Sequence, residues 1–142
     1  MYKLTDVSLN KKTVEDYFLA WKKYDVVLLG DVFDFHADYI IRNKNVTLRG
    51  FDQIKEYWLK NEKRQNNLQL NWKTILIDTK NAQVDFRASF FGVDENAFVQ
   101  VQGKINFCFN RDSKISELSE RYKKTILSNR GNNRQIKYSR TS

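Results

Sequence analysis

Hydrophobic residues recur every three or four positions early in the chain, which is the spacing of one face of an α-helix. Between Thr13 and Asp25 the apolar positions are Val14, Tyr17, Phe18, Trp21 and Tyr24. Thr13 and Asp16 resemble a capping box, so the pattern predicts a helix that begins near Asn10 or Thr13. Further helical segments are predicted over residues 26–33 and, capped by Asp52, over residues 53–66.

Elsewhere the apolar residues alternate with polar ones, and β-branched and aromatic residues are frequent, which is typical of strands. The alternation predicts a hairpin over residues 36–43 and 46–49, then long strands over residues 68–78, 82–93, 97–110 and 114–126. Short polar turns separate the long strands. Helices that precede mostly antiparallel strands indicate an α+β fold. We expect a curved sheet, mixed but mostly antiparallel, that wraps around the N-terminal helices to form a cone.

The composition is that of one globular domain. The chain has 142 residues, 41% of them hydrophobic, and no apolar run is long enough to cross a membrane. The N-terminus lacks the pattern of a signal peptide. Cys108 is the single cysteine, which excludes an intramolecular disulfide and a zinc site of the usual spacing. We therefore expect one domain over residues 1–127 in a reducing, cytoplasmic setting.

Positive charge is concentrated at the C-terminus. The formal net charge is +8, and residues 128–142 contribute four cations and no acid: Arg130, Arg134, Lys137 and Arg140. We expect this segment to be a basic, disordered tail. The remaining body carries 21 basic and 17 acidic residues, a net charge typical of solubility alone. Nucleic acid is therefore not an expected partner, apart from a weak contact by the tail, where Tyr138 lies beside Lys137.

Three segments carry a family resemblance: VEDYFLAWKKYDVVLLGDVF from residue 14, GFDQIKEYW from residue 50, and FCFNRDSKISELSERY from residue 107. Residues 11–127 resemble the nuclear transport factor 2-like superfamily, in its SnoaL-like and ketosteroid isomerase-like branch. The resemblance implies a cystatin-like α+β barrel whose cone holds a small, mostly apolar or aromatic molecule. It also implies a homodimer through the outer sheet face, where Arg87, Gln100, Gln102 and Lys104 lie.

The catalytic groups of ketosteroid isomerase can be compared with this chain. The tyrosine that stabilises the oxyanion in that enzyme matches Tyr17. The aspartate base matches Ile41, and the protonated aspartate matches Ile105. Proton abstraction next to a carbonyl needs a positioned base. Because both acids are isoleucine, isomerase chemistry of that kind is not expected, and whether the chain is an enzyme stays open.

The alternation predicts which side chains face the interior. With Ile41 and Ile105 inward, their neighbours at period two also face inward. The candidate ligand-binding residues are Trp21, Tyr39, Ile41, Tyr57, Trp58, Phe86, Phe90, Ile105 and Phe107. The alternative is that these aromatic residues fill the cone as an ordinary core.

Four residues are candidates for catalysis: Tyr17, His36, Asp38 and Glu120. Glu120 has Leu118 and Tyr122 at period two, so it is the best replacement acid; the alternative is a surface pair with Arg121. His36 and Asp38 share one face of a strand, and the alternative is that both are exposed. Asp34, His36 and Asp38 do not complete a metal site by spacing alone, so neither a metal nor a cofactor is expected.

Two functions remain open. The first is a small-molecule-binding domain, with or without cyclase-, isomerase- or dehydratase-like chemistry. The second is a non-catalytic interaction or scaffold protein that acts through its outer sheet face or its basic tail. A cone that is open to a ligand would support the first function, and a cone filled by its own side chains would support the second.

Overall fold

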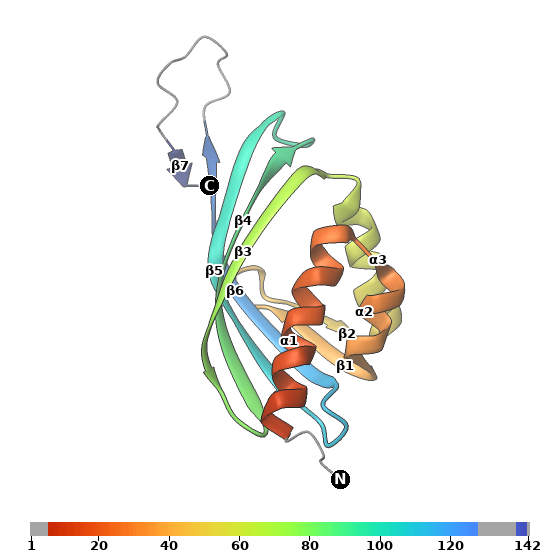
Figure 1. Cartoon of the computed structure of the whole chain (residues 1–142). Helices are drawn as coiled ribbons and strands as arrows, with labels where there is room; N and C mark the ends of the chain where they lie inside the picture. Colours follow the sequence, from red (N-terminus) through yellow and green to blue (C-terminus); the bar gives the residue numbers. More distant parts are fainter. Residues whose placement is uncertain (1–5, 128–138, 142) are drawn as a thin grey trace.

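The computed structural model describes residues 6–127 and 139–141, in which helices pack against one face of a strongly bent sheet (Figure 1). The helical elements are α1 (Asp6–Lys23), α2 (Val26–Val32), the 3₁₀ turn η1 (Arg42–Lys44) and α3 (Phe51–Glu62). The strands are β1 (Phe33–Ile41), β2 (Val46–Arg49), β3 (Gln65–Ile77), β4 (Asn81–Gly92), β5 (Ala97–Phe109), β6 (Ile115–Leu127) and β7 (Ser139–Thr141). The predicted α+β fold is confirmed.

One seven-stranded sheet forms the second layer, in the order β2-β1-β6-β5-β4-β3, with β7 added beside β6. Strands β3 to β6 form an antiparallel meander. β1 and β6 are parallel, which makes the sheet mixed, as predicted. The bend carries the sheet around α1, so the inner face and the helices enclose a cone (Figure 1).

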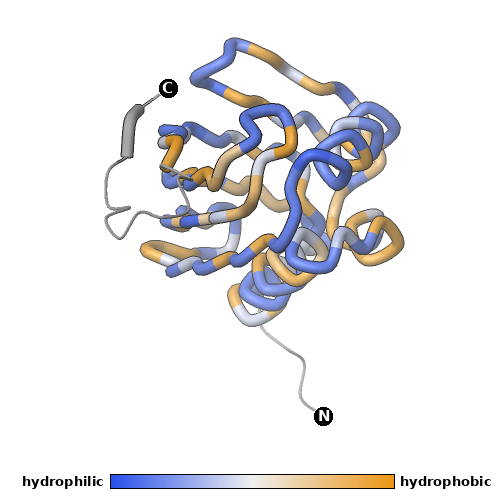
Figure 2. Tube along the Cα trace, turned by 90° about the horizontal axis from the view of Figure 1, so that it is seen from above, coloured by the Kyte–Doolittle hydropathy of each residue, from blue (hydrophilic) through white to orange (hydrophobic). Residues whose placement is uncertain are grey.

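Hydrophobic and polar residues alternate along the strands, as Figure 2 shows by hydropathy. On β4 the buried positions are Val84, Phe86, Ala88 and Phe90. On β5 they include Val99, Ile105 and Phe107, whereas Gln102 and Lys104 are exposed. The inward and outward assignments made from period two are therefore correct on these two strands.

α1 begins earlier than the sequence predicted. It starts at Asp6, and Thr13 lies inside it, with its hydroxyl donating to the carbonyl oxygens of Leu9 (3.1 Å) and Ser113 (2.7 Å). Asp16 accepts from Lys12 at 2.6 Å instead of capping the helix. The predicted capping box was wrong, because the helix begins at Asp6 and both side chains lie within it with other partners.

α3 is shorter than predicted and begins one residue before Asp52. Its N-cap is Gly50, at φ 85°, a conformation that favours glycine. Gln65 and Asn66, assigned to this helix from the sequence, pair with Gly92 and Phe91 and belong to β3.

The C-terminal segment is described only in part. Residues 128–138 and 142 of the expected disordered tail lie outside the described residues. Ser139–Thr141 form β7, which pairs with Thr125–Leu127 of β6 and was not predicted. No helix in the described part of the chain is long and apolar enough to cross a membrane.

Aromatic rings fill the core below α1. Tyr17 and Phe18 are fully buried, and the ring of Tyr17 makes edge contacts with Phe107 (5.4 Å) and Trp58 (5.6 Å between centroids). Phe18 stacks on Trp72 of the edge strand β3 at 4.6 Å. Edge and offset arrangements are the favoured ones for such rings. The narrow end of the cone is therefore a packed core.

Polar bonds hold the beginning of α1 against two sheet turns. The side-chain amide of Asn10 donates to the carbonyl oxygens of Asp78 and Thr79, both at 3.1 Å. The Thr13–Ser113 bond attaches the same helix to the turn between β5 and β6. These bonds fix α1 at the narrow end of the cone.

The burial of Phe107 predicts a large cost for its removal. Phe107→Ala should lower the free energy of unfolding by about 3 to 5 kcal/mol, because it removes a fully buried ring and leaves a cavity. Urea denaturation of the full chain measures the change. The matched control is Phe35→Ala, where the ring is 60% exposed and the loss should stay below about 1 kcal/mol. Equal losses in the two variants would contradict the core described above.

Candidate functional site

A cavity of about 200 Å³ lies between α1, α3 and the inner face of the sheet, at the end of the cone opposite Asn10. Its buried walls are Tyr39, Trp58, Phe86, Phe90 and Glu120. The half-buried part consists of Trp21, Tyr24, Tyr57, Asn61, Gln65, Glu95, Val101, Tyr122 and Lys124. Its exposed rim is Lys44, Arg64 and Asp94. The inside is thus mostly aromatic, and the charges lie at the mouth.

Glu120 is placed in the wall by the pairing of three strands. In the register, Glu120 of β6 lies opposite Ile41 of β1 on one side and opposite Ile105 of β5 on the other. All three side chains face inward and are buried. The carboxyl group therefore lies in one row between two isoleucines, the positions that the sequence-based resemblance paired with acids.

The environment of Glu120 favours its neutral form. Burial raises the pKa of Glu120 to about 7, and the hydrogen bond from Tyr39 and the charge of Lys44 lower it by less. Among the described residues no cation forms an ion pair with Glu120. A carboxyl group with this pKa exchanges its proton near neutral pH, as an acid–base catalyst must.

Two buried phenols support Glu120. The hydroxyl of Tyr39 donates to Glu120 Oε1 at 2.8 Å, and the hydroxyls of Tyr17 and Tyr39 lie 3.4 Å apart. Burial raises the pKa of both phenols well above its usual value, so both stay neutral donors. Because the Tyr39 proton points to Glu120, Tyr17 is the donor in the contact between the two hydroxyls. The bonds run from Tyr17 to Tyr39 to Glu120.

The mouth is formed by charged and amide side chains. Lys124 forms an ion pair with Glu95, and Arg64 forms one with Asp94 at 3.4 Å. Burial raises the pKa of Glu95, but the hydrogen bond and charge of Lys124 outweigh it, and the net pKa is lowered. Glu95 thus keeps its charge, and these pairs border the opening to the cavity.

Gln65 holds the helix side of the cavity. Its side-chain oxygen accepts from the hydroxyl of Tyr24 and from Trp21 Nε1, at 3.5 Å for the latter. Burial raises the pKa of Tyr24, which keeps it a neutral donor at this position. The end of α1 is therefore attached to the beginning of β3.

The structure brings seven of the sequence-predicted residues together around the cavity: Trp21, Tyr39, Tyr57, Trp58, Phe86, Phe90 and Glu120. Ile41, Ile105 and Phe107 are buried but do not line it, because the ring of Tyr17 packs over Phe107 and fills the cone beneath the cavity. Tyr17 itself does not line the cavity; its hydroxyl contacts that of Tyr39, and its ring contacts the lining residue Trp58.

His36 and Asp38 lie apart from this cavity. The inward positions of β1 are Ala37, Tyr39 and Ile41, so the residues between them face the other side of the sheet. His36 is exposed, and Asp38 pairs with Arg49 at 3.6 Å. The structure therefore does not place these two residues beside Glu120. Within the described residues no group of acids, histidine and cysteine could hold a metal ion.

Several lining residues were not predicted from the sequence. Tyr122 and Lys124 share the inward face of β6 with Glu120, so the period-two pattern could have identified both. Gln65 was missed because it was assigned to a helix. Glu95 lies in the β4–β5 turn, and no periodic pattern predicts where a turn side chain points.

Comparison of the sequence with known proteins gives no assignment: no protein-family model and no curated protein matches the chain. Many solved structures match its fold. A candidate SnoaL-like polyketide cyclase from Shewanella denitrificans OS-217 aligns with a TM-score of 0.71 at 10% identity, over 80% of this chain and 89% of that one.

Two further structures are similar. An NTF2-like protein from Burkholderia xenovorans LB400 aligns with a TM-score of 0.67 at 16% identity, over 82% of this chain and 90% of that one. An LEH-like epoxide hydrolase from M. tuberculosis aligns with a TM-score of 0.67 at 13% identity, over 83% and 85%. The predicted resemblance is confirmed at the level of the fold: the chain has the nuclear transport factor 2-like fold, as found in SnoaL-like and ketosteroid isomerase-like proteins.

The raised pKa of Glu120 predicts a pH-dependent stability. The folded state holds this proton more tightly than the unfolded chain, whose glutamate pKa is 4.5. The contribution of protonated Glu120 to the free energy of unfolding is therefore fully present below pH 4.5 and is lost as the pH rises through about 7. The loss amounts to roughly 3 kcal/mol by pH 8.

Urea denaturation from pH 4 to pH 8 measures this loss. Glu120→Gln should remove it, because glutamine does not titrate. Glu117→Gln, on the outward face of the same strand, is the matched control and should keep the wild-type pH dependence. If the pH dependence of stability were unchanged in Glu120→Gln, the pKa of this carboxyl group would not be raised in the folded state.

Proposed function

We propose that the chain binds a small, mostly aromatic molecule in the cavity and that Glu120 transfers protons to and from it. The observation that carries this proposal is a buried carboxyl group, free of an ion pair to a described cation, in the wall of an aromatic cavity, with a pKa of about 7. General acid–base catalysis is most effective when the pKa of the group is near the working pH. Strongly shifted carboxyl groups in cavities are candidates for function.

The volume of the cavity limits the ligand. A cavity of about 150 Å³ accommodates one benzene ring, and typical ligand pockets have about 300 to 1,000 Å³. At about 200 Å³, the cavity fits one ring or a small fused pair. The ring of Trp21 contacts those of Trp58 and Phe86 at interplanar angles of 62° and 57°, and the three rings would surround such a molecule.

The chemistry that fits best is proton transfer at a carbon next to a carbonyl group. The ionised carboxyl group of Glu120 takes the proton, and the electron pair of the C–H bond moves toward the carbonyl oxygen. Tyr57 lines the cavity, and burial raises its pKa, so it stays a neutral donor that could stabilise that oxygen. If Glu120 returns the proton to another carbon, the reaction is an isomerisation. If a hydroxide leaves the neighbouring carbon and takes the proton from Glu120 as water, the reaction is a dehydration.

The names of similar structures support this class of chemistry without fixing the reaction. They include a candidate polyketide cyclase and a candidate ketosteroid isomerase. Glu120 lies on a different strand from the positions matched to the acids of ketosteroid isomerase. Its carboxyl group would therefore approach a ligand from between Ile41 and Ile105. The reaction is therefore expected to use one carboxyl group and phenols.

The second candidate is a non-catalytic interaction protein that acts through its outer sheet face. The exposed cations on that face favour it. The predicted homodimer through the same face stays a prediction, as does the cytoplasmic location. Two copies meeting there would bring together two faces that each carry an excess of cations, which opposes a dimer of that geometry.

Deuterium exchange tests the proton-transfer proposal. The full chain at pH 8 should exchange the protons next to the carbonyl of 2-cyclohexen-1-one, as proton NMR measures. A four-ring steroid enone should not react, because it exceeds the cavity. The exchange rate of Glu120→Gln should be at least about 100-fold lower than that of the wild type. Tyr39→Phe should lose less, because it removes only one hydrogen bond to the base.

Glu117→Gln is the matched control for this experiment and should exchange at the wild-type rate. Binding of the enone is followed separately by the fluorescence of Trp21 and Trp58. Binding without exchange would leave a ligand-binding domain and exclude the catalytic role. Exchange at equal rates in wild type and Glu120→Gln would exclude Glu120 as the base.

A further inference from the structure

A groove on the sheet face opposite the helices is lined by cations. It has a volume of about 990 Å³ and twelve lining residues, of which six are basic and none is acidic. The basic residues are Arg42, Lys44, Lys104, Arg121, Lys123 and Lys124, of which Lys44 and Lys124 also line the mouth of the inner cavity. Amide and hydroxyl side chains lie between them: Asn43, Gln102, Asn106 and Ser119.

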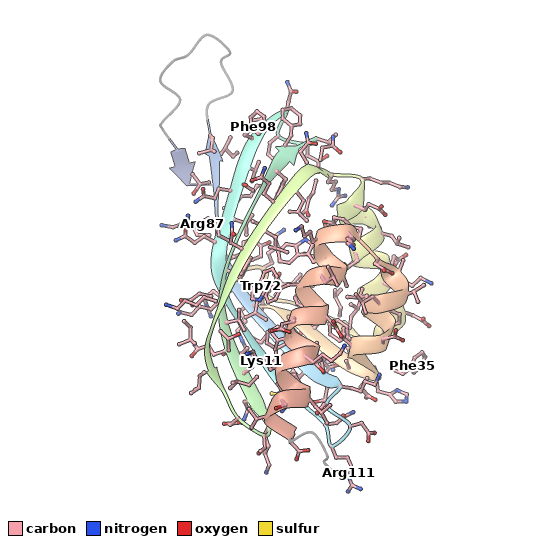
Figure 3. The ribbon with its side chains drawn as sticks, in the orientation of Figure 1. Lys11, Phe35, Trp72, Arg87, Phe98 and Arg111 are labelled. Carbon is pink, nitrogen blue, oxygen red and sulfur yellow. The ribbon has the colours of Figure 1, made fainter. Side chains whose placement is uncertain are left out.

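The strand register produces this concentration of charge. Lys104 of β5 lies opposite Arg121 of β6, and Gln102 lies opposite Lys123. Across the next pairing, Arg87 of β4 lies opposite Gln102. Figure 3 shows Arg87 pointing away from the helices. The net charge of the body is modest, but its sheet cations come together on one face.

The protein itself neutralises only part of this charge: among the groove cations, Lys124 forms an ion pair with Glu95. Lys104 has one partner, Asp85 at 2.7 Å, and Arg42 donates to the hydroxyl of Ser119 at 2.7 Å. Within the described residues Arg87, Arg121 and Lys123 form no ion pair. Like charges directly opposite each other on neighbouring strands destabilise a sheet. A bound polyanion would relieve this repulsion.

An aromatic pair lies on the same face, at one end of β4 and β5. Phe91 and Phe98 are opposite each other in the register, and their rings meet edge to face at 5.3 Å. Phe98 is 50% exposed and lies at the upper end of the sheet in Figure 3. Period two along β5 places Phe98, Gln102 and Lys104 on one face. The face thus combines an exposed ring with a basic groove.

We propose that this face binds single-stranded nucleic acid. A basic groove that follows the backbone, together with an exposed aromatic ring for a base, is the usual arrangement in proteins that bind single strands. The phosphates would contact Arg87, Arg121 and Lys123, and a base would stack on Phe98.

Other partners fit this face less well. An acidic protein would satisfy the cations but not the exposed ring and the amide groups beside them. A second copy of the chain would place like charges together. The sequence-based expectation against nucleic acid rested on net charge, which does not show how charges are distributed over the surface.

Fluorescence anisotropy with labelled 15-nucleotide DNA and RNA single strands tests the proposal. The full chain should bind at 50 mM salt, and the two oligonucleotides decide between DNA and RNA. The triple variant Arg87→Gln, Arg121→Gln, Lys123→Gln should lose about tenfold or more in affinity at that salt. Its salt dependence should fall by about two in log–log slope, because each phosphate contact contributes about 0.7.

Phe98→Ala should weaken binding about fivefold or more without changing the salt slope, since stacking releases no counterions. The matched control removes three exposed cations from the helical layer: Lys11→Gln, Lys55→Gln, Lys60→Gln. It should bind as the wild type does. A second control, Arg130→Gln, Arg134→Gln, Lys137→Gln, measures the contribution of the tail and should keep most of the affinity.

Four results would overturn the proposal. The first is that neither oligonucleotide binds, and the second is that the triple variant and the helical control lose affinity equally. The third is that only the tail variant loses binding. The fourth is that polyglutamate at equal charge concentration displaces the oligonucleotide. Light scattering that shows a dimer in the wild type and a monomer in the triple variant would assign the face to self-association instead.

Discussion

The parallel pairing of β1 with β6 is the constraint on which the rest of the molecule depends. It joins the strand that follows the first two helices to the last strand of the meander. Without it the sheet would be an open meander with α1 and α2 attached only by side-chain packing. The same pairing brings Tyr39 beside Glu120, 81 positions apart in sequence. The pairing that closes the fold thus also places two residues of the cavity wall side by side.

Glu120 lies in an otherwise apolar row on the inner face of the sheet. Three adjacent inward positions share one row, and here the outer two are isoleucine and the central one is glutamate. The flanking isoleucines offer the carboxyl group no polar partner. Tyr39 alone, of the described residues, donates to it. Burial consequently raises its pKa, and the hydrogen bond of Tyr39 and the charge of Lys44 offset only part of that rise.

The sequence predicted those parts of the molecule that repeat with a fixed period. Phe86, Ile105 and Glu120 could be placed inward because side chains on a strand alternate. The position of Gln65 could not be predicted, because the local residue pattern around it is equally compatible with a helix and a strand. The contact of Lys124 with Glu95 depends on the shape of a turn and on long-range pairing. The gathering of cations on the outer face also required the register, which no single strand reveals.

The attachment of α1 is uneven along its length. At its beginning, Asn10 and Thr13 bind main-chain oxygens of two different turns, which cannot move independently of the sheet. At its end, Trp21 and Tyr24 share one side-chain acceptor, Gln65. A substitution of Gln65 would therefore remove the acceptor of both rings at the cavity end and leave the attachment near Asn10 intact.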